Sequence, residues 1–259
     1  MEFYLLEYKI RILNFTNISF QISNIPYISN ICNVFRSINQ VIGVLIMAKQ
    51  KPFKLISLIS GGIDSPVATY LMLSRGADIA ALYFDSRPFI DKQTRTKVIN
   101  LIDRLKQVTK INFKLFIIPH GNNQTLIVKR CDRHLSCILC RRMMLRLAEL
   151  VGRKERAIAL ITGDSLGQVA SQTLQNIYVE SQAVDMPIIR PLIGLDKIEI
   201  ERIARKIGTY EISIGPGLCC TIVPSKPSTN AALKRILHEE EKLDIDSMVK
   251  DSIEKMEVL

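Results

Sequence analysis

Residues 60–65 read Ser-Gly-Gly-Ile-Asp-Ser, and their types and spacing suit the binding of a phosphate. They follow an apolar run of strand length and precede residues with helical spacing. Gly61 and Gly62 have no Cβ, so the backbone there can approach an anion closely. A helix that starts after them would direct unpaired N–H groups at the same anion, and Ser60 and Ser65 add hydroxyl donors. The segment therefore predicts a phosphate-binding turn, with a tight strand-to-helix turn without a ligand as the alternative.

Asp64 is unusual in such a turn, because a carboxylate repels phosphate unless a cation lies between them. Two roles are open for it: binding of Mg²⁺ that bridges to a pyrophosphate group, or capping of the helix start. No lysine follows the glycines, so the segment does not have the Walker A pattern.

Six cysteines form a second group of chemically capable residues: Cys32, Cys131, Cys137, Cys140, Cys219 and Cys220. Cys137 and Cys140 are spaced C-x-x-C and are followed at once by Arg141. Thiols near a helix start and beside arginines are expected to have lowered pKa values, which suits nucleophiles, persulfide carriers or iron–sulfur ligands. Two ordinary thiols are the alternative. Cys220 lies in a loop rich in Gly and Pro, where we expect it to be accessible and to meet a partner from elsewhere in the chain.

Alternating strands and helices must position these residues. We expect strands at 54–60, 79–84, 114–118, 157–162 and 188–189, and helices at 66–75, 91–109, 141–151, 169–176 and 197–207. This order predicts an α/β fold with a doubly wound, mostly parallel five-stranded sheet and helices on both faces. A ligand of such a sheet lies beyond the carboxyl ends of the strands, which places Tyr83, Phe84 and Gly163 in the same cleft.

The composition is that of a packed soluble protein, with 47% hydrophobic and 23% charged residues in 259. No stretch approaches the roughly 20 apolar residues of a membrane span, and the first residues do not resemble a signal peptide. We therefore expect a cytoplasmic protein without membrane contact. The formal net charge of +10 favours a polyanionic partner such as nucleic acid, with a merely basic surface as the alternative.

Three segments differ in character. Residues 1–46 are poor in charge and lack a sustained period, and we interpret them either as upstream DNA translated before a true start at Met47 or as a small fused domain. Residues 47–228 hold the predicted sheet. Residues 229–259 predict an amphipathic, highly charged helical tail.

Several blocks of this sequence together resemble the tRNA 4-thiouridine sulfurtransferases, which also serve thiazole formation in thiamine synthesis: 60–67, 140–144, 162–173, 190–197, 207–212 and 219–227. The likeness covers residues 54–228. It implies that residues 60–65 are the PP-loop of an ATP-pyrophosphatase, with an adenine nucleotide alpha hydrolase-like fold, and that ATP with Mg²⁺ yields AMP and pyrophosphate.

The resemblance also assigns residues. The family's ATP contacts fall on Leu58, Ile59, Tyr83, Phe84, Arg141, Gly163 and Gln172, beside the loop itself; the family usually has His at the position of Tyr83. Its sulfur-handling cysteine falls on Cys220. The pair Cys137 and Cys140 matches an archaeal-type variant in which these two and the later cysteine act together, with an iron–sulfur cluster as the proposed holder of sulfur.

The partners implied are tRNA and a sulfur donor, either a cysteine desulfurase persulfide or free sulfide. Family members usually carry an N-terminal RNA-binding THUMP domain, for which we find no room before Phe53, so a separate THUMP-type chain is one expectation. Arg130, Arg133, Arg142 and Arg146 are candidates for holding RNA phosphates; a solvated charged face is the alternative. A homodimer stays open.

The implied reaction adenylates the 4-oxygen of a uridine and replaces it with sulfur. Two other functions remain open at this point. One is a PP-loop ligase or amidotransferase that acts on a small molecule, and the other is a nucleotide-binding subunit of a tRNA-modifying complex.

Overall fold

A computed structural model describes residues 53–167, 172–217 and 220–259 of the chain. The chain divides into two units between Lys51 and Pro52. The first unit, and with it the predicted segment 1–46 and the predicted start at Met47, lies outside the described residues.

A six-stranded sheet in the order β5-β4-β1-β2-β3-β6 forms the centre of the second unit. Its members are β1 (Lys54–Ile59), β2 (Asp78–Asp85), β3 (Leu115–Pro119), β4 (Ala159–Ile161), β5 (Ile188–Ile189) and β6 (Glu257–Val258). The first five strands are parallel, and β6 pairs antiparallel with β3 at the edge. The predicted doubly wound fold is confirmed; the sixth strand was not predicted.

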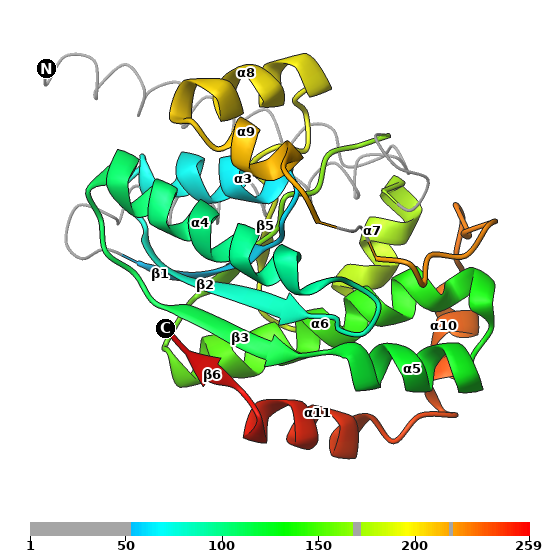
Figure 1. Ribbon diagram of the computed structural model, residues 1–259. Helices are drawn as coiled ribbons and strands as arrows, with labels where there is room; N and C mark the ends of the chain where they lie inside the picture. Colours follow the sequence, from blue (N-terminus) through cyan, green and yellow to red (C-terminus); the bar gives the residue numbers. More distant parts are fainter. Residues whose placement is uncertain (1–52, 168–171, 218–219) are drawn as a thin grey trace, which may run out of the picture. The chain divides into compact units, whose positions relative to one another are not determined.

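Helices cover both faces of this sheet (Figure 1). On one face lie α3 (Asp64–Leu73), α4 (Lys92–Thr109), α8 (Lys197–Ile207) and α9 (Tyr210–Ile214); on the other lie α5 (Gly121–Arg130), α6 (Ser136–Lys154), α7 (Leu174–Ser181), α10 (Leu233–Glu240) and α11 (Ile245–Glu254). Successive residues of a strand point alternately into the hydrophobic cores on the two faces of the sheet: Leu55 packs on the first face and Ile56 on the second.

The order of the strands reverses beside β1. The chain leaves β1 through α3 to reach β2 on one side, whereas β4 lies on the other side of β1. In open α/β sheets the carboxyl ends of strands separate at such a switch point and leave room for a ligand. The predicted phosphate turn, which follows β1, therefore opens at this point of the sheet.

Some helix ends were predicted correctly, and others were not. Asp196 caps α8 in a capping box with Glu199, and Gly208 ends the helix in the left-handed conformation that glycine adopts without strain. Helix α6, expected at 141–151, begins at Ser136, so the C-x-x-C pair lies inside it. Helices α5 and α9 were not predicted, and the helix expected at 169–176 is α7, with residues 168–171 outside the description.

The tail from residue 229 contains two helices and strand β6, and it packs on α6 through buried charges. Arg142, with 1% of its side chain exposed, and Arg146 both donate to the carboxylate of Glu240 at 2.6–2.9 Å. These two arginines were expected to face RNA phosphates. That expectation is wrong for Arg142, whose buried guanidinium pairs with Glu240 at the junction of α10 and α6; Arg146, with 21% of its side chain exposed, shares the same carboxylate.

No helix in the described ranges is long and apolar enough to cross a membrane.

Replacement of Glu240 by Ala should destabilise the protein by about 3 kcal/mol or more, because it leaves the buried guanidinium of Arg142 without its counter-charge. Urea unfolding measures this loss. Glu241→Ala is the control: Glu241 is the next residue, its side chain is 74% exposed and it pairs only with His238, so the change should stay within about 0.5 kcal/mol. Equal unfolding free energies for both variants would contradict the role of Glu240.

Candidate functional site

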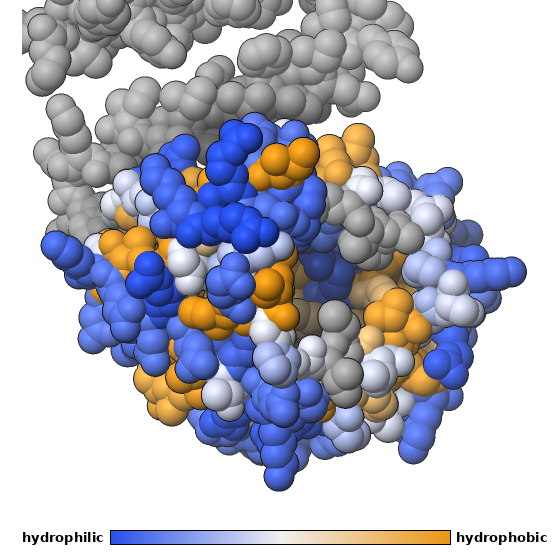
Figure 2. All heavy atoms as spheres, turned by 45° about the horizontal axis from the view of Figure 1, so that its top comes forward, coloured by the Kyte–Doolittle hydropathy of each residue, from blue (hydrophilic) through white to orange (hydrophobic). Residues whose placement is uncertain are grey.

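A pocket opens at the carboxyl ends of β1 and β4, and one of its walls is the predicted phosphate turn. It is lined by Leu58, Ile59, Ser60, Gly62, Asp64, Ser65, Arg141, Met144, Leu145, Thr162, Gly163, Asp164 and Gln172. In Figure 2 this face of the molecule is hollowed, with hydrophilic residues in the depth of the hollow and hydrophobic residues on either side of it. Most of the predicted nucleotide contacts thus come together.

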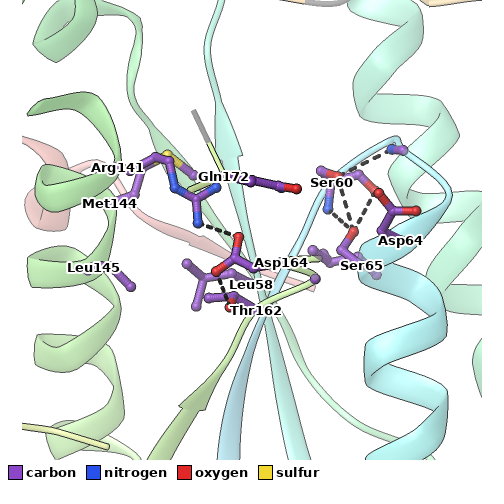
Figure 3. Close-up of a pocket in the computed structure, with 13 residues that line it drawn as sticks. Leu58, Ser60, Asp64, Ser65, Arg141, Met144, Leu145, Thr162, Asp164 and Gln172 are labelled. Atoms are coloured by element: carbon purple, nitrogen blue, oxygen red, sulfur yellow. Dashed lines mark hydrogen bonds and ion pairs between the residues drawn. The ribbon is translucent and has the colours of Figure 1, made fainter. Parts of the chain in front are cut away.

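The turn between β1 and α3 is held by its own serines. Ser65 Oγ accepts a hydrogen bond from the backbone N–H of Ser60 at 2.8 Å, and Ser60 Oγ accepts one from Gly62 N–H at 3.2 Å. The two hydroxyls lie 3.1 Å apart (Figure 3). No side chain caps the start of α3, where Ile63 occupies the N-cap position. The helix start therefore faces the pocket with uncapped amides, as an anion-binding site requires.

Gly163 brings the end of β4 directly against this turn. A Cβ at Gly163 would lie 2.7 Å from the backbone nitrogen of Ser65 and 2.8 Å from its Cα. Side chains do not tolerate such distances, and the obstacle is backbone, which cannot swing away. The glycine is therefore required by close approach.

The wall opposite the turn consists of a buried network of charges. Arg141 donates to Asp164 at 2.5 Å and to Glu180 at 2.7 Å, and Arg190 donates to Asp164 at 3.1 Å. Figure 3 shows Arg141 and Asp164 facing each other across from Ser60 and Ser65. Two of the three nitrogens of the Arg141 guanidinium are thus engaged by carboxylates, although the residue was predicted as a phosphate contact.

The two carboxylates of this network differ in their pKa. Burial alone would raise the pKa of Asp164, but Arg141, the hydroxyl of Thr162 and Arg190 outweigh it, and the pKa lies below its usual range. Burial dominates for Glu180 and raises its pKa, and its buried Oε1 has no hydrogen-bond partner in the described structure. Asp164, Glu180 and Arg190 received no role from the sequence, although Asp164 and Arg190 lie in blocks that carry the family resemblance.

Asp64 lies at the mouth of the turn and pairs with Lys197 at 2.9 Å. Its carboxylate is 28% exposed, so it neither caps α3 nor lies buried. Lys197 begins α8 and was not predicted as a site residue. A single carboxylate beside a phosphate turn matches the way Mg²⁺ is usually held, by one or two carboxylates plus the phosphates of a ligand.

Tyr83 and Phe84 do not line the pocket. Both are buried at the end of β2, on the far side of β1 from β4, where Phe84 packs edge-on against His120. Burial raises the pKa of the Tyr83 phenol. The structure thus separates these two predicted contacts from the others.

Three cysteines converge beside the pocket. Cys137 and Cys140 lie one turn apart on α6, directly before Arg141. The side-chain amide of Gln124 donates to the sulfurs of Cys140, at 3.5 Å, and of Cys220, at 3.6 Å. Cys220 thus meets a partner from elsewhere in the chain, as expected, whereas Cys219 lies outside the described residues.

The predicted lowering of the thiol pKa values is wrong for the C-x-x-C pair. Burial raises the pKa of Cys137, and it raises the pKa of Cys140 to about 12. The neighbouring arginines do not offset burial, because Arg141 is bound by two carboxylates and Arg142 by Glu240. His120, whose pKa burial lowers to about 4, lies 3.1 Å from the sulfur of Cys140 as a neutral ring.

Among the described residues, no group of three or more Cys, His, Asp and Glu side chains is arranged to hold a metal ion.

Comparison with known proteins decides the family. Residues 52–245 match the family described as thiamine biosynthesis protein, ThiI. The chain belongs to the ThiI family. A relative from Caldanaerobacter subterraneus, named probable tRNA sulfurtransferase, is 45% identical over 194 residues, which cover 74% of this chain and 51% of the relative. One of the same name from Methanothermobacter thermautotrophicus is 40% identical over 203 residues, 78% of this chain and 52% of the relative.

A solved structure agrees with this assignment. The crystal structure of a 4-thiouridine synthetase–RNA complex with bound ATP superimposes with a TM-score of 0.77 at 36% identity. The match covers 80% of this chain and 55% of that one. The chain thus spans about half the length of the ThiI-family proteins that it matches.

The thiol of Cys140 should react slowly and with a steep pH dependence. With a pKa near 12 against about 8.5 for a free thiol, its thiolate fraction at pH 8 is lower by roughly a thousandfold. The rate should rise about tenfold per pH unit up to that pKa. Alkylation with iodoacetamide between pH 7.5 and 9.5, followed by mass spectrometry, measures it. In urea the same residue should react like a free thiol; equal rates in folded and unfolded protein would contradict the effect of burial.

Proposed function

We propose that this protein is an ATP-dependent sulfurtransferase that converts a uridine of tRNA to 4-thiouridine. The observation that carries the proposal is that an uncapped, glycine-lined phosphate turn forms one wall of a pocket, while another wall comes from α6, whose thiols lie beside the pocket next to Arg141. Membership of the ThiI family and the names of its relatives support the substrate. By the same membership, supply of sulfur for the thiazole of thiamine is part of the proposal.

ATP binds with its phosphates on the turn and its base toward the wall formed by Leu58, Met144 and Gln172. The amides of the turn and the start of α3 stabilise the charge that develops on the phosphates during transfer. Asp64 would hold Mg²⁺ together with those phosphates, in exchange for Lys197, and the ion would neutralise phosphate charge. The 4-oxygen of the uridine attacks the α-phosphate, and pyrophosphate leaves.

Sulfur reaches the activated base from Cys220. We assign the carrier as a persulfide, because Gln124 donates to the sulfurs of both Cys220 and Cys140 and so keeps a second thiol close to the carrier. The terminal sulfur attacks C4, AMP leaves with the former 4-oxygen, and the base is joined to Cys220 through a disulfide. A second thiol then attacks the sulfur of Cys220, which frees 4-thiouridine and leaves a protein disulfide. Cys140, which shares the amide of Gln124 with Cys220, is placed for this step. An external thiol reductant resets the pair.

Recognition of tRNA draws on exposed cations near the thiols. Arg130 and Arg133 are exposed at the end of α5 and after it, and unlike Arg142 and Arg146 they take part in no ion pair among the described residues. His134, next to them, bonds the carbonyl of Lys226 in the loop that follows Cys220. Because the chain spans half the length of its relatives, we assign the rest of RNA capture to a THUMP-type RNA-binding unit, here or on a partner chain. A cysteine desulfurase persulfide supplies the sulfur by passing its outer sulfur to the Cys220 thiol. Free sulfide supplies it only by attacking the protein disulfide that each turnover leaves, which gives the Cys220 persulfide and frees the second thiol. Cytoplasmic tRNA is the substrate.

Replacement of Cys220 by Ala should abolish 4-thiouridine formation and leave the affinity for ATP unchanged, because the thiol carries sulfur and does not line the nucleotide pocket. The assay combines protein, ATP, cysteine with a cysteine desulfurase, a thiol reductant and tRNA from a strain lacking 4-thiouridine, with nucleoside analysis by mass spectrometry. Cys131→Ala is the control, since Cys131 is buried outside the thiol group and bonds the carbonyl of Glu239. Undiminished thiolation by the Cys220 variant would remove the proposed carrier. ATP binding without any AMP formation would favour a nucleotide-binding subunit.

A further inference from the structure

Lys97 lies between the phosphate turn and the segment that leads to Cys220. Its side chain comes from α4 and crosses Gly61 so closely that a Cβ on that glycine would meet Lys97 Cδ at 3.2 Å. Its ammonium lies beside Gly217, where a Cβ would meet Nζ at 2.9 Å. Both neighbours are glycines, so the lysine occupies space that side chains would otherwise fill.

The ammonium has an incomplete set of partners. It donates to the backbone carbonyl of Ser213 at 3.2 Å, and it belongs to none of the ion pairs of the described structure. Lys197, on the other flank of the turn, pairs with Asp64 instead. A half-buried ammonium held by one neutral carbonyl gains more than an exposed one from a second, anionic partner.

The arrangement of the residues around the pocket indicates which part of a bound nucleotide would reach the ammonium of Lys97. Figure 3 shows Arg141 on one side, the turn with Ser60 and Ser65 on the other, and Gln172 between them. A nucleotide whose base lies by Gln172 points its outer phosphates across the turn. Gly61, against which Lys97 packs, lies between Ser60 and Gly62, which both line the pocket, so the lysine flanks the turn on which the phosphates would lie.

We propose that Lys97 binds the two outer phosphates of ATP and holds them as they leave as pyrophosphate. This rests on the proposed function, to which it adds a binding residue for the leaving group. When the bond between the α- and β-phosphates breaks, the electron pair passes to the β-phosphate oxygen. A fixed cation there lowers the barrier without transferring a proton.

Helix α9 keeps the lysine in place before the ligand arrives. Ser213 accepts from Lys97 through its carbonyl and donates through its hydroxyl to the carbonyl of Gly62 at 3.2 Å. Ser213 of α9 thereby forms hydrogen bonds with both Lys97 and the phosphate turn and restricts the movement of each. Such pre-positioning reduces the entropy lost when a flexible lysine side chain binds an anion.

Calorimetry with pyrophosphate, Mg·ATP and AMP tests the assignment on Lys97→Met, which keeps the apolar stem and removes the charge. Pyrophosphate and ATP should bind about ten- to a hundredfold more weakly, the usual effect of losing a charged hydrogen bond, while AMP binds as before. Lys97→Arg should retain most of the affinity. Lys92→Met, an exposed lysine on the same helix, should change nothing.

The outcomes separate the two proposals. If Lys97→Met binds pyrophosphate as tightly as the unaltered protein, or loses as much affinity for AMP as for pyrophosphate, the role of Lys97 is overturned. ATP binding by the unaltered protein would still support the nucleotide site in that case. Absence of ATP binding by the unaltered protein would overturn both. If Lys97→Met does not fold, chemical acylation of the lysines in the unaltered protein replaces this test. Bound pyrophosphate should protect Lys97 from acylation and leave Lys92 reactive. Equal acylation of Lys97 with and without pyrophosphate would refute the assignment.

Discussion

The contact between Gly163 and the backbone of Ser65 is the constraint on which this site depends. It brings the end of β4 against the first turn of α3 at a distance that no Cβ would permit. Because β1 and β4 are parallel neighbours, their carboxyl ends meet at one edge of the sheet, and the strand order reverses between them. The phosphate turn, the pocket and the residues that follow β4 are placed by this contact.

The two walls of the pocket differ in their electrostatics, and the difference tells where an anion belongs. On the α6 side, Arg141 and Arg190 are matched by Asp164 and Glu180, so this wall has little charge left to offer. On the α3 side the helix start is uncapped, hydroxyls hold the turn, and the carboxylate of Asp64 is paired with Lys197. The turn is therefore the part of the pocket that stabilises a polyphosphate, and the charged network fixes the position of α6 and its thiols relative to the turn.

Much of this fold could be predicted from the sequence. Continuous apolar strands between helices identified a parallel sheet, and the helix predicted at 197–207 has the bounds of α8, because strand pattern and helix ends are local signals. The phosphate turn was predicted for the same reason, since its glycines and serines are contiguous. Strand β6 was not, because two residues at a sheet edge acquire their role only from pairing with β3.

The errors at the site have one physical origin, which is tertiary pairing of charges. Arg142 looked like a surface cation, but Glu240, 98 residues later, buries and neutralises it. The cysteines looked activated by their neighbours, but those arginines are engaged elsewhere and burial dominates the thiol pKa values. Tyr83 and Phe84, by contrast, end β2 on the side of β1 away from the pocket, and their contact with the nucleotide stays a prediction. The spacing of residues in the sequence does not show which side chain, distant in the chain, pairs with a charged group and determines whether that group is free to bind a ligand.

Calorimetric binding of Mg·ATP to Gly163→Ala tests the central constraint most directly, with Gly194→Ala, whose added Cβ meets open space, as the control. The added methyl of the first variant must push the Ser65 backbone away, so its ATP affinity should fall by at least about tenfold, the effect of roughly 1.4 kcal/mol. The control should bind as tightly as the unaltered protein, and both should remain folded. Tight ATP binding by a folded Gly163→Ala protein would contradict the account.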